Sequence, residues 1–218
     1  MGLQTIIDNA TYISINKRKG SGLTVSRSGH VKTSFAQGSV YRFTVGMHAG
    51  LKYSTNRGLL EDLDALDRIT ESNISLNNNT GMNYVTAYQG DIAQAQLDNL
   101  TMVGSNGSEL YIDQTGATGS GTLFKKGDYI QPQGNTGTYR YPYQVTSDVT
   151  FDSGSANTTI SVHRPVLSQD GVALTSGGLR VGNDVRFHTI ILNAPTYSIA
   201  PHDLIEFSDD FELLEVIT

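Results

Sequence analysis

The chain is 218 residues long, which is enough for one large β domain or two smaller ones. Only 17% of the residues are charged, and uncharged polar residues and glycine replace the missing charge, which favours strands and turns over helices. The net charge of −6 argues against broad nucleic-acid binding, and the lack of cysteine excludes disulfides, a thiol nucleophile and thiolate-bound zinc. No apolar run approaches the roughly 20 residues that cross a bilayer, so we expect no membrane segment.

The first 35 residues predict four short strands, each from an apolar or alternating run. These runs are LQTII (3–7), YISI (12–15), LTVSR (23–27) and VKTSF (31–35). The last two are separated by Ser28, Gly29 and His30, a short link that contains glycine, so they predict a hairpin. The basic stretch KRK (17–19) is interpreted as a solvated loop, with contact to an acidic neighbouring subunit as the alternative.

The next segment, VYRFTV (40–45), predicts the clearest strand of the chain. Its residues alternate, so Tyr41, Phe43 and Val45 are expected on one face and the intervening residues on the other.

A single amphipathic helix is predicted after this strand. Its apolar face is formed by leucines at i, i+4 and i+7: Leu59, Leu63 and Leu66. We expect Thr55 or Asn56 to cap its N-terminus and the helix to end near Thr70. Covering one face of a sheet is the ordinary role of such a helix.

The middle of the chain predicts many short strands. SNISL (72–76) and YVTAY (84–88) are expected to be strands that flank a polar loop. Between residues 97 and 184 further strand-like runs alternate with Gly-rich turns: LDNLTMV, ELYID, GDYIQP, YPYQVTSDV, TTISVHRPV and GLRVG. This spacing indicates a small barrel or sandwich inserted into the first domain.

The C-terminal stretch is apolar again and carries a cluster of acids. VRFHTIIL (185–192) predicts a buried strand, and DLIEF (203–207) and FELLEVI (211–217) predict a hairpin that turns at Ser208, Asp209 and Asp210.

Paired carboxylates such as these could perform acid–base chemistry. The turn position instead favours a structural role, with Glu206 and Glu212 as cross-strand neighbours and Glu215 nearby on the solvated side. We therefore expect this hairpin to close the domain and its acids to mark the turn and the wet face.

No other motif indicates a catalytic or cofactor site. The five histidines are scattered, without metal-ligand spacing: His30, His48, His163, His188 and His202. No nucleophile elbow, phosphate-binding loop or dinucleotide fingerprint is present. We assign no catalytic, cofactor-binding or metal-binding residue and expect no cofactor.

The tyrosine-rich run TYRYPYQV (138–145) is the remaining candidate for binding. Its tyrosines and Arg140 could form a stacking platform for a sugar or a nucleic acid, with Lys125 and Lys126 adding charge. The alternative is that the tyrosines pack on a sheet face, with Pro142 at an edge or bulge.

Four stretches together indicate a protein family: SGLTVSRSGHVKTS, YRFTV leading to STNRGLLEDLDALDRI, KKGDYIQPQG with YPYQVTSDV, and PTYSIAPHDLIEFSDDFELLEVI. Their arrangement over most of the chain resembles the distal tail and tube-to-baseplate ring proteins of tailed bacteriophages. The fold expected from this resemblance is mainly β with one principal helix. It comprises a tail-tube-like β-sandwich or barrel domain (1–96 and 185–218) and an inserted, small, OB-like β-barrel domain (97–184).

The function implied by the resemblance is structural. The chain is expected not to be an enzyme but to form a homo-oligomeric ring, sixfold in symmetry, that joins the tail tube to the baseplate or tail tip. Its expected partners are further copies of itself and the tube and hub proteins, while DNA passes through the lumen without specific binding. Its expected location is the virion tail, after assembly in the host cytoplasm.

Three alternatives are weighed against this function. A carbohydrate- or receptor-binding module would use Tyr139 or Tyr141, and a hydrolase would use Asp210. A head-to-tail connector would also form a ring and would differ only in its position in the virion.

Overall fold

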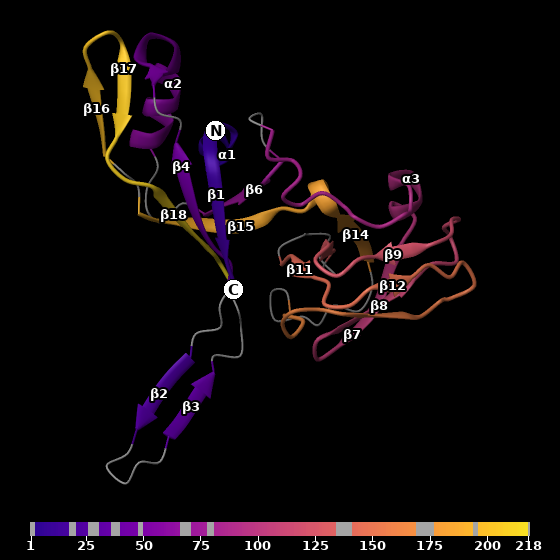
Figure 1. The fold of residues 1–218 in the computed structure, drawn as a ribbon. Helices are drawn as coiled ribbons and strands as arrows, with labels where there is room; N and C mark the ends of the chain where they lie inside the picture. The colour runs from indigo at the N-terminus through magenta and orange to yellow at the C-terminus, as the bar shows by residue number, and fades with distance from the viewer. Residues whose placement is uncertain are drawn as a thin grey trace.

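The computed structural model describes most of the chain: residues 3–17, 21–25, 31–35, 40–47, 50–65, 71–77, 81–133, 141–168, 177–193 and 196–217. Its elements are several antiparallel sheets and a few short helices, as Figure 1 shows. The mainly β class expected from the composition is confirmed.

A five-stranded antiparallel sheet joins the two ends of the chain. In spatial order its strands are β1 (Ala10–Asn16), β4 (Arg42–Met47), β18 (Phe211–Glu215), β15 (Phe187–Asn193) and β6 (Glu71–Ile74). The strand nearest the C-terminus therefore lies at the centre of the sheet, between β4 and β15.

The predicted alternation around β4 is confirmed. Tyr41, Phe43 and Val45 are completely buried, whereas Arg42 on the other face is exposed.

The expected strand over LQTII is wrong, because this run forms helix α1 (Leu3–Asp8). Its buried residues lie at i, i+3 and i+4, which is one helical face: Leu3, Ile6 and Ile7. A five-residue apolar run is too short for its periodicity to separate helix from strand.

The predicted amphipathic helix is α2 (Tyr53–Asp64), and its leucines 59, 60 and 63 are buried. The expected capping is wrong, because no side chain caps at the N-cap residue Lys52, and Asn56 lies inside the helix at a kink. The cap comes from distant Asp203: the backbone N–H of Ser54 donates to its carboxylate at 2.8 Å. The helix ends at Asp64, and residues 66–70 lie outside the described part.

The predicted C-terminal hairpin is wrong. β17 (Leu204–Phe207) pairs with β16 (Tyr197–Ala200) and with β5 (Leu51–Lys52) in a separate three-stranded sheet, whereas β18 belongs to the five-stranded sheet. The polar link at residues 208–210 thus carries the chain from one sheet to another. The real hairpin joins β16 to β17, and its turn contains His202 and Asp203, both with φ near +70°.

The predicted hairpin near the N-terminus is confirmed as β2 (Ser21–Val25) paired with β3 (Val31–Phe35). In Figure 1 this two-stranded ribbon extends away from the five-stranded sheet, on the side opposite α2, β16 and β17.

The middle of the chain forms a curled six-stranded half-barrel. Its strand order is β11 (Tyr143–Gln144), β10 (Tyr129–Pro132), β14 (Gly177–Val181), β7 (Thr101–Asn106), β8 (Glu109–Asp113) and β13 (Thr158–Ser161). A bridge between Val145 and Val162 links the ends of the two edge strands. The accompanying elements are a two-stranded sheet of β9 (Thr122–Phe124) and β12 (Val149–Thr150), helix α3 (Gln94–Leu97) and the short helix η1 (Gly182–Asp184).

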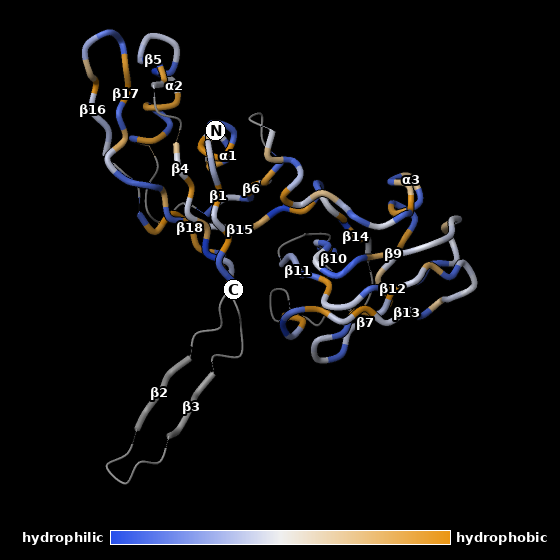
Figure 2. Tube along the Cα trace, viewed as in Figure 1, coloured by the Kyte–Doolittle hydropathy of each residue, from blue (hydrophilic) through white to orange (hydrophobic). Residues whose placement is uncertain are grey.

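The expected strand over YVTAY is wrong, because residues 84–88 form turns and irregular backbone. This connector contacts both hydrophobic cores of the molecule: Val85 packs against the first cluster of buried residues and Tyr88 against the second. The first cluster belongs mainly to the five-stranded sheet with α1 and α2, and the second to the half-barrel (Figure 2). Tyr129 from β10 joins the first cluster, so the two cores meet. The domain boundaries at residues 97 and 184 stay a prediction.

Candidate functional site

The most distinctive polar feature of the described residues is a buried ion pair where the two cores meet. Arg164, which follows β13 in the half-barrel, donates from Nη1 to Oε2 of Glu215 and from Nη2 to Oε1, both at 2.6 Å. Glu215 is the last residue of β18 in the five-stranded sheet. Both side chains have no exposed surface. This is the bidentate fork geometry, in which each guanidinium nitrogen faces one carboxylate oxygen.

Both members of the ion pair also make hydrogen bonds to nearby backbone groups. The backbone N–H of Tyr41 donates to Glu215 Oε2 at 3.1 Å, and Arg164 Nη2 also donates to the carbonyl oxygen of Pro142 at 3.0 Å. The guanidinium carbon lies 5.3 Å from the ring centroids of both Tyr41 and Tyr143. Burial alone would lower the pKa of Arg164, but the hydrogen bonds and negative charge of Glu215 outweigh it and raise that pKa.

A second, uncharged connection also joins the half-barrel to the five-stranded sheet. The buried side chain of Gln131 in β10 donates to the carbonyl oxygen of Arg186 at 2.6 Å and accepts from the N–H of Arg186 at 2.9 Å. Arg186 immediately precedes β15 of the five-stranded sheet. Together with the ion pair, this contact fixes how the half-barrel is oriented relative to the sheet.

The expectation that Glu215 lies on the wet face is wrong, and its ion pair with Arg164 was not predicted. The signal was present in FELLE (211–215), where Phe211, Leu213 and Glu215 alternate onto one face, and that face is buried. Nothing in the sequence indicated Arg164 as the partner, because it lies 51 positions from Glu215, after β13 of the half-barrel.

The other terminal acids do not converge. Asp210 accepts a hydrogen bond from the hydroxyl of Tyr12 in β1, and this bond raises the pKa of Tyr12. Glu206 lies on β17 and Glu212 on β18, so they are not cross-strand neighbours as expected. Among the described residues, no group of three or more His, Cys, Asp and Glu side chains gathers as a metal site would require.

The tyrosine-rich run is buried where the structure describes it. Tyr141 and Tyr143 are 2% and 0% exposed, which leaves them no face for stacking a ligand. The Tyr143 hydroxyl accepts from the N–H of Leu167 at 2.8 Å, and burial raises its pKa to about 12. For these two tyrosines the packing interpretation is confirmed, while Tyr139 and Arg140 lie outside the described residues. Lys125 and Lys126 form part of a turn whose N–H groups donate to Asp128 and Asp148.

The histidines that the structure describes are separate from one another. His163 accepts from the N–H of Gln144 at 3.0 Å, and His188 lies 2.8 Å from a carboxylate oxygen of Glu71. His202 is in the β16–β17 turn, whereas residues 30 and 48 lie outside the described part.

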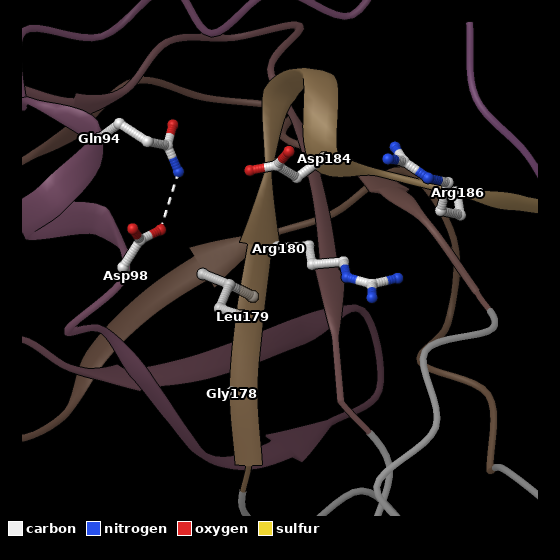
Figure 3. A pocket seen from close by; sticks show the side chains of 7 residues that line it. All are labelled: Gln94, Asp98, Gly178, Leu179, Arg180, Asp184 and Arg186. Atoms are coloured by element: carbon white, nitrogen blue, oxygen red, sulfur yellow. Dashed lines mark hydrogen bonds between the residues drawn. The ribbon is translucent and has the colours of Figure 1, made fainter. Parts of the chain in front are cut away.

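An open pocket of about 350 Å³ lies beside β14 and α3 (Figure 3). Its charged residues are of both signs: Asp98, Arg180, Asp184 and Arg186. The side chain of Gln94 donates to Asp98 at 2.9 Å, and Nη1 of Arg186 donates to Ser75 and to two backbone carbonyl groups. With mixed charge and much of its polar lining already engaged, this pocket does not define a ligand.

None of the helices in the described residues is long and apolar enough to span a bilayer. No protein-family model matches the chain, and no curated protein matches it either.

Proposed function

We propose that the chain is a structural protein that assembles into a homo-oligomeric ring, sixfold in symmetry, at the end of a tailed-phage tail tube. One observation carries this proposal. The five-stranded sheet ends in two edge strands, β1 and β6, and neither pairs with a further described strand. Unpaired edges favour association, and a ring lets one edge of each copy meet the other edge of the next.

The residues of β1 suit a contact with another copy. This edge strand has seven residues, and its Tyr12 side chain is 47% exposed. A long, exposed edge is an aggregation hazard in a monomer. Closure into a ring would cover it in every copy, which turns the hazard into the assembly contact.

The buried ion pair supports the same proposal. Arg164 and Glu215 hold the half-barrel in one orientation relative to the sheet. Each copy in a ring would then present its half-barrel at the same angle, which suits a strut or docking face for neighbouring tail proteins. In this proposal residues 1–96 and 185–218 form a tail-tube-like domain, and residues 97–184 form an OB-like inserted barrel.

The proposed partners follow from this position. They are further copies of the chain, the tail tube on one side and hub proteins of the baseplate or tip on the other. DNA would pass through the lumen without specific binding, consistent with the net charge of −6. The protein would be assembled in the host cytoplasm and remain in the virion tail.

The experiment that tests the proposal is the solution mass by light scattering over a range of concentrations, with electron-microscope class averages of the same sample. We expect closed rings with a central hole. A mass of one copy at all concentrations, without rings in the micrographs, would contradict the proposal. Immunogold labelling of intact virions then separates a tail-end ring from a head-to-tail connector.

A further inference from the structure

The charges of this chain are strongly segregated along its sequence. Residues 17–35, which include the β2–β3 ribbon, contain five basic residues and no acid: Lys17, Arg18, Lys19, Arg27 and Lys32. Because the whole chain has a net charge of −6, the rest of the molecule carries −11. A basic segment of this kind on an acidic protein indicates an acidic partner surface.

The β2–β3 ribbon has little support of its own. Its two described strands pair with each other and with no other described strand, and the ribbon extends away from the sheet in Figure 1. An isolated two-stranded hairpin is marginally stable in water. Its two free edges also offer backbone N–H and C=O groups for strand addition. A partner that supplies a strand edge would stabilise it.

The opposite end of the molecule offers such a surface. There α2 lies beside the three-stranded sheet, at the end of the five-stranded sheet that is remote from the ribbon (Figure 1). Three exposed carboxylates lie on this end: Glu61 and Asp64 on α2 and Glu206 on β17. We call this surface, consisting of α2, β16 and β17, the acidic end.

The acidic end also has a free strand edge. β16 is the outer strand of its sheet, and no further described strand pairs with it. Ile199 on β16 is 53% exposed, so an apolar side chain lies next to the free backbone groups. Strand addition needs this combination of an open edge and a side-chain contact, while the carboxylates select a basic strand.

We propose that the β2–β3 ribbon of one copy, which lies within the basic segment 17–35, docks on the acidic end of a second copy, edge to edge with β16. The partner is another copy because the two surfaces lie at opposite ends of one molecule and have opposite charge. The contact is heterologous, so it repeats from copy to copy. It rests on the proposed self-assembly and adds a second contact to the one proposed between the β1 and β6 edges.

A disulfide cross-link tests the contact directly, since the native chain has no cysteine. Thr33→Cys on β3 is mixed with Ser198→Cys on β16 under mild oxidation, and non-reducing electrophoresis should show their heterodimer. Ser108→Cys, at an exposed turn of the half-barrel, replaces Ser198→Cys in the matched control and should give none. To cover the other ribbon edge, the same mixture is made with Thr24→Cys on β2. Absence of the heterodimer from both mixtures would overturn the proposal.

A charge-swap experiment separates lost contact from lost folding. One variant carries Lys17→Glu and Lys32→Glu, and the other carries Glu61→Lys and Glu206→Lys. Each alone should self-associate about tenfold more weakly or worse in analytical ultracentrifugation. The charge of residues 17–35 falls from +5 to +1 in the first variant, and two of the three exposed carboxylates of the acidic end become cations in the second, so the attraction is largely lost in each. A mixture of the two should regain association, which a misfolded variant could not do. Failure of the mixture to regain it would contradict the proposal.

Two further readouts distinguish this contact from nucleic-acid binding and from the ring contact. If the ribbon variant loses binding to duplex DNA but keeps its self-association, the ribbon is a nucleic-acid surface and the proposal is wrong. Electron microscopy distinguishes the contact from the ring: cross-linked open chains would support the contact and contradict the ring. Rings in samples in which neither cysteine mixture gives the heterodimer would support the ring and contradict the contact.

Discussion

The substitution Glu215→Gln tests the buried junction with the smallest change of shape. Glutamine keeps the length of the side chain and one carbonyl oxygen, but it removes the negative charge that faces Arg164 at 2.6 Å. Its amide nitrogen is a donor and cannot accept from a guanidinium. The variant therefore leaves a buried cation with one acceptor fewer and with no opposite charge.

The expected cost is large because neither side chain has exposed surface. Removing one partner of a buried pair typically costs about 3–5 kcal/mol, since the remaining charge is uncompensated. A domain has a total stability of about 5–15 kcal/mol, so the loss is a substantial fraction of it. With a urea m-value of about 3 kcal/mol per molar, the unfolding midpoint should fall by about 1–1.7 M.

The same sheet provides a matched control. Glu71 faces His188 at 2.8 Å, but its side chain is 43% exposed. Glu71→Gln removes the same charge from a solvated pair, for which we expect a loss below about 1 kcal/mol.

The measurement is urea unfolding followed by far-ultraviolet circular dichroism and by tyrosine fluorescence, because the chain has eleven tyrosines and no tryptophan. A Glu215→Gln variant no less stable than Glu71→Gln would refute the argument that the pair needs its charge. A probe-dependent transition would instead show that the two cores unfold separately in the variant.

Three other changes to the chain have expected outcomes. Deleting residues 211–217 should prevent folding, measured by circular dichroism, because β18 is the central strand of the five-stranded sheet. Gly46→Ala should lower the midpoint of thermal unfolding, because its Cβ would lie 2.0 Å from the Tyr12 ring, and much of this loss should disappear in a Tyr12→Ala background. Hydrogen bonds from Ser54 lower the pKa of Asp203, so its stabilisation is complete above the ordinary aspartate pKa and is lost as pH falls through the lowered value. Stability measured against pH should therefore have a shallower acid limb in Asp203→Asn.

Each of these predictions has an outcome that contradicts it. A deletion variant with native circular dichroism would show that β4 and β15 can pair without β18. An equal effect of Gly46→Ala with and without Tyr12 would show that the clash with this ring is not the cause. Identical acid limbs for Asp203→Asn and the native chain would show that this carboxylate does not contribute as a cap.

The sequence predicted those parts of the fold that depend on local pattern. Residues 40–45, at and before the start of β4, alternate, and the partners β2 and β3 are separated by a short link, so neighbouring residues contain the whole signal. The leucine spacing in α2 is equally local. In each case the period of the apolar residues decides the element.

The errors arose where a partner distant in sequence decides the structure. β17 and β18 are adjacent and apolar, which suggests a hairpin, but each has better partners elsewhere: β16 and β5 for one, β4 and β15 for the other. The cap of α2 comes from Asp203, 149 positions after Ser54. The rules for hairpins and helix caps consider only residues that are close in sequence, so they cannot predict such partners.

The buried pair explains why the last strand matters for both halves of the molecule. Glu215 accepts hydrogen bonds from Arg164 and from the backbone N–H of Tyr41. Arg164 in turn donates to the carbonyl oxygen of Pro142. One carboxylate therefore joins the edge of the half-barrel, the start of β4 and the end of β18. A pair of apolar residues could fill the same volume, but it would leave the Tyr41 N–H and the Pro142 carbonyl oxygen without these partners. The charge pair is thus favoured at this junction because it joins irregular backbone from both halves, which apolar packing alone does not satisfy.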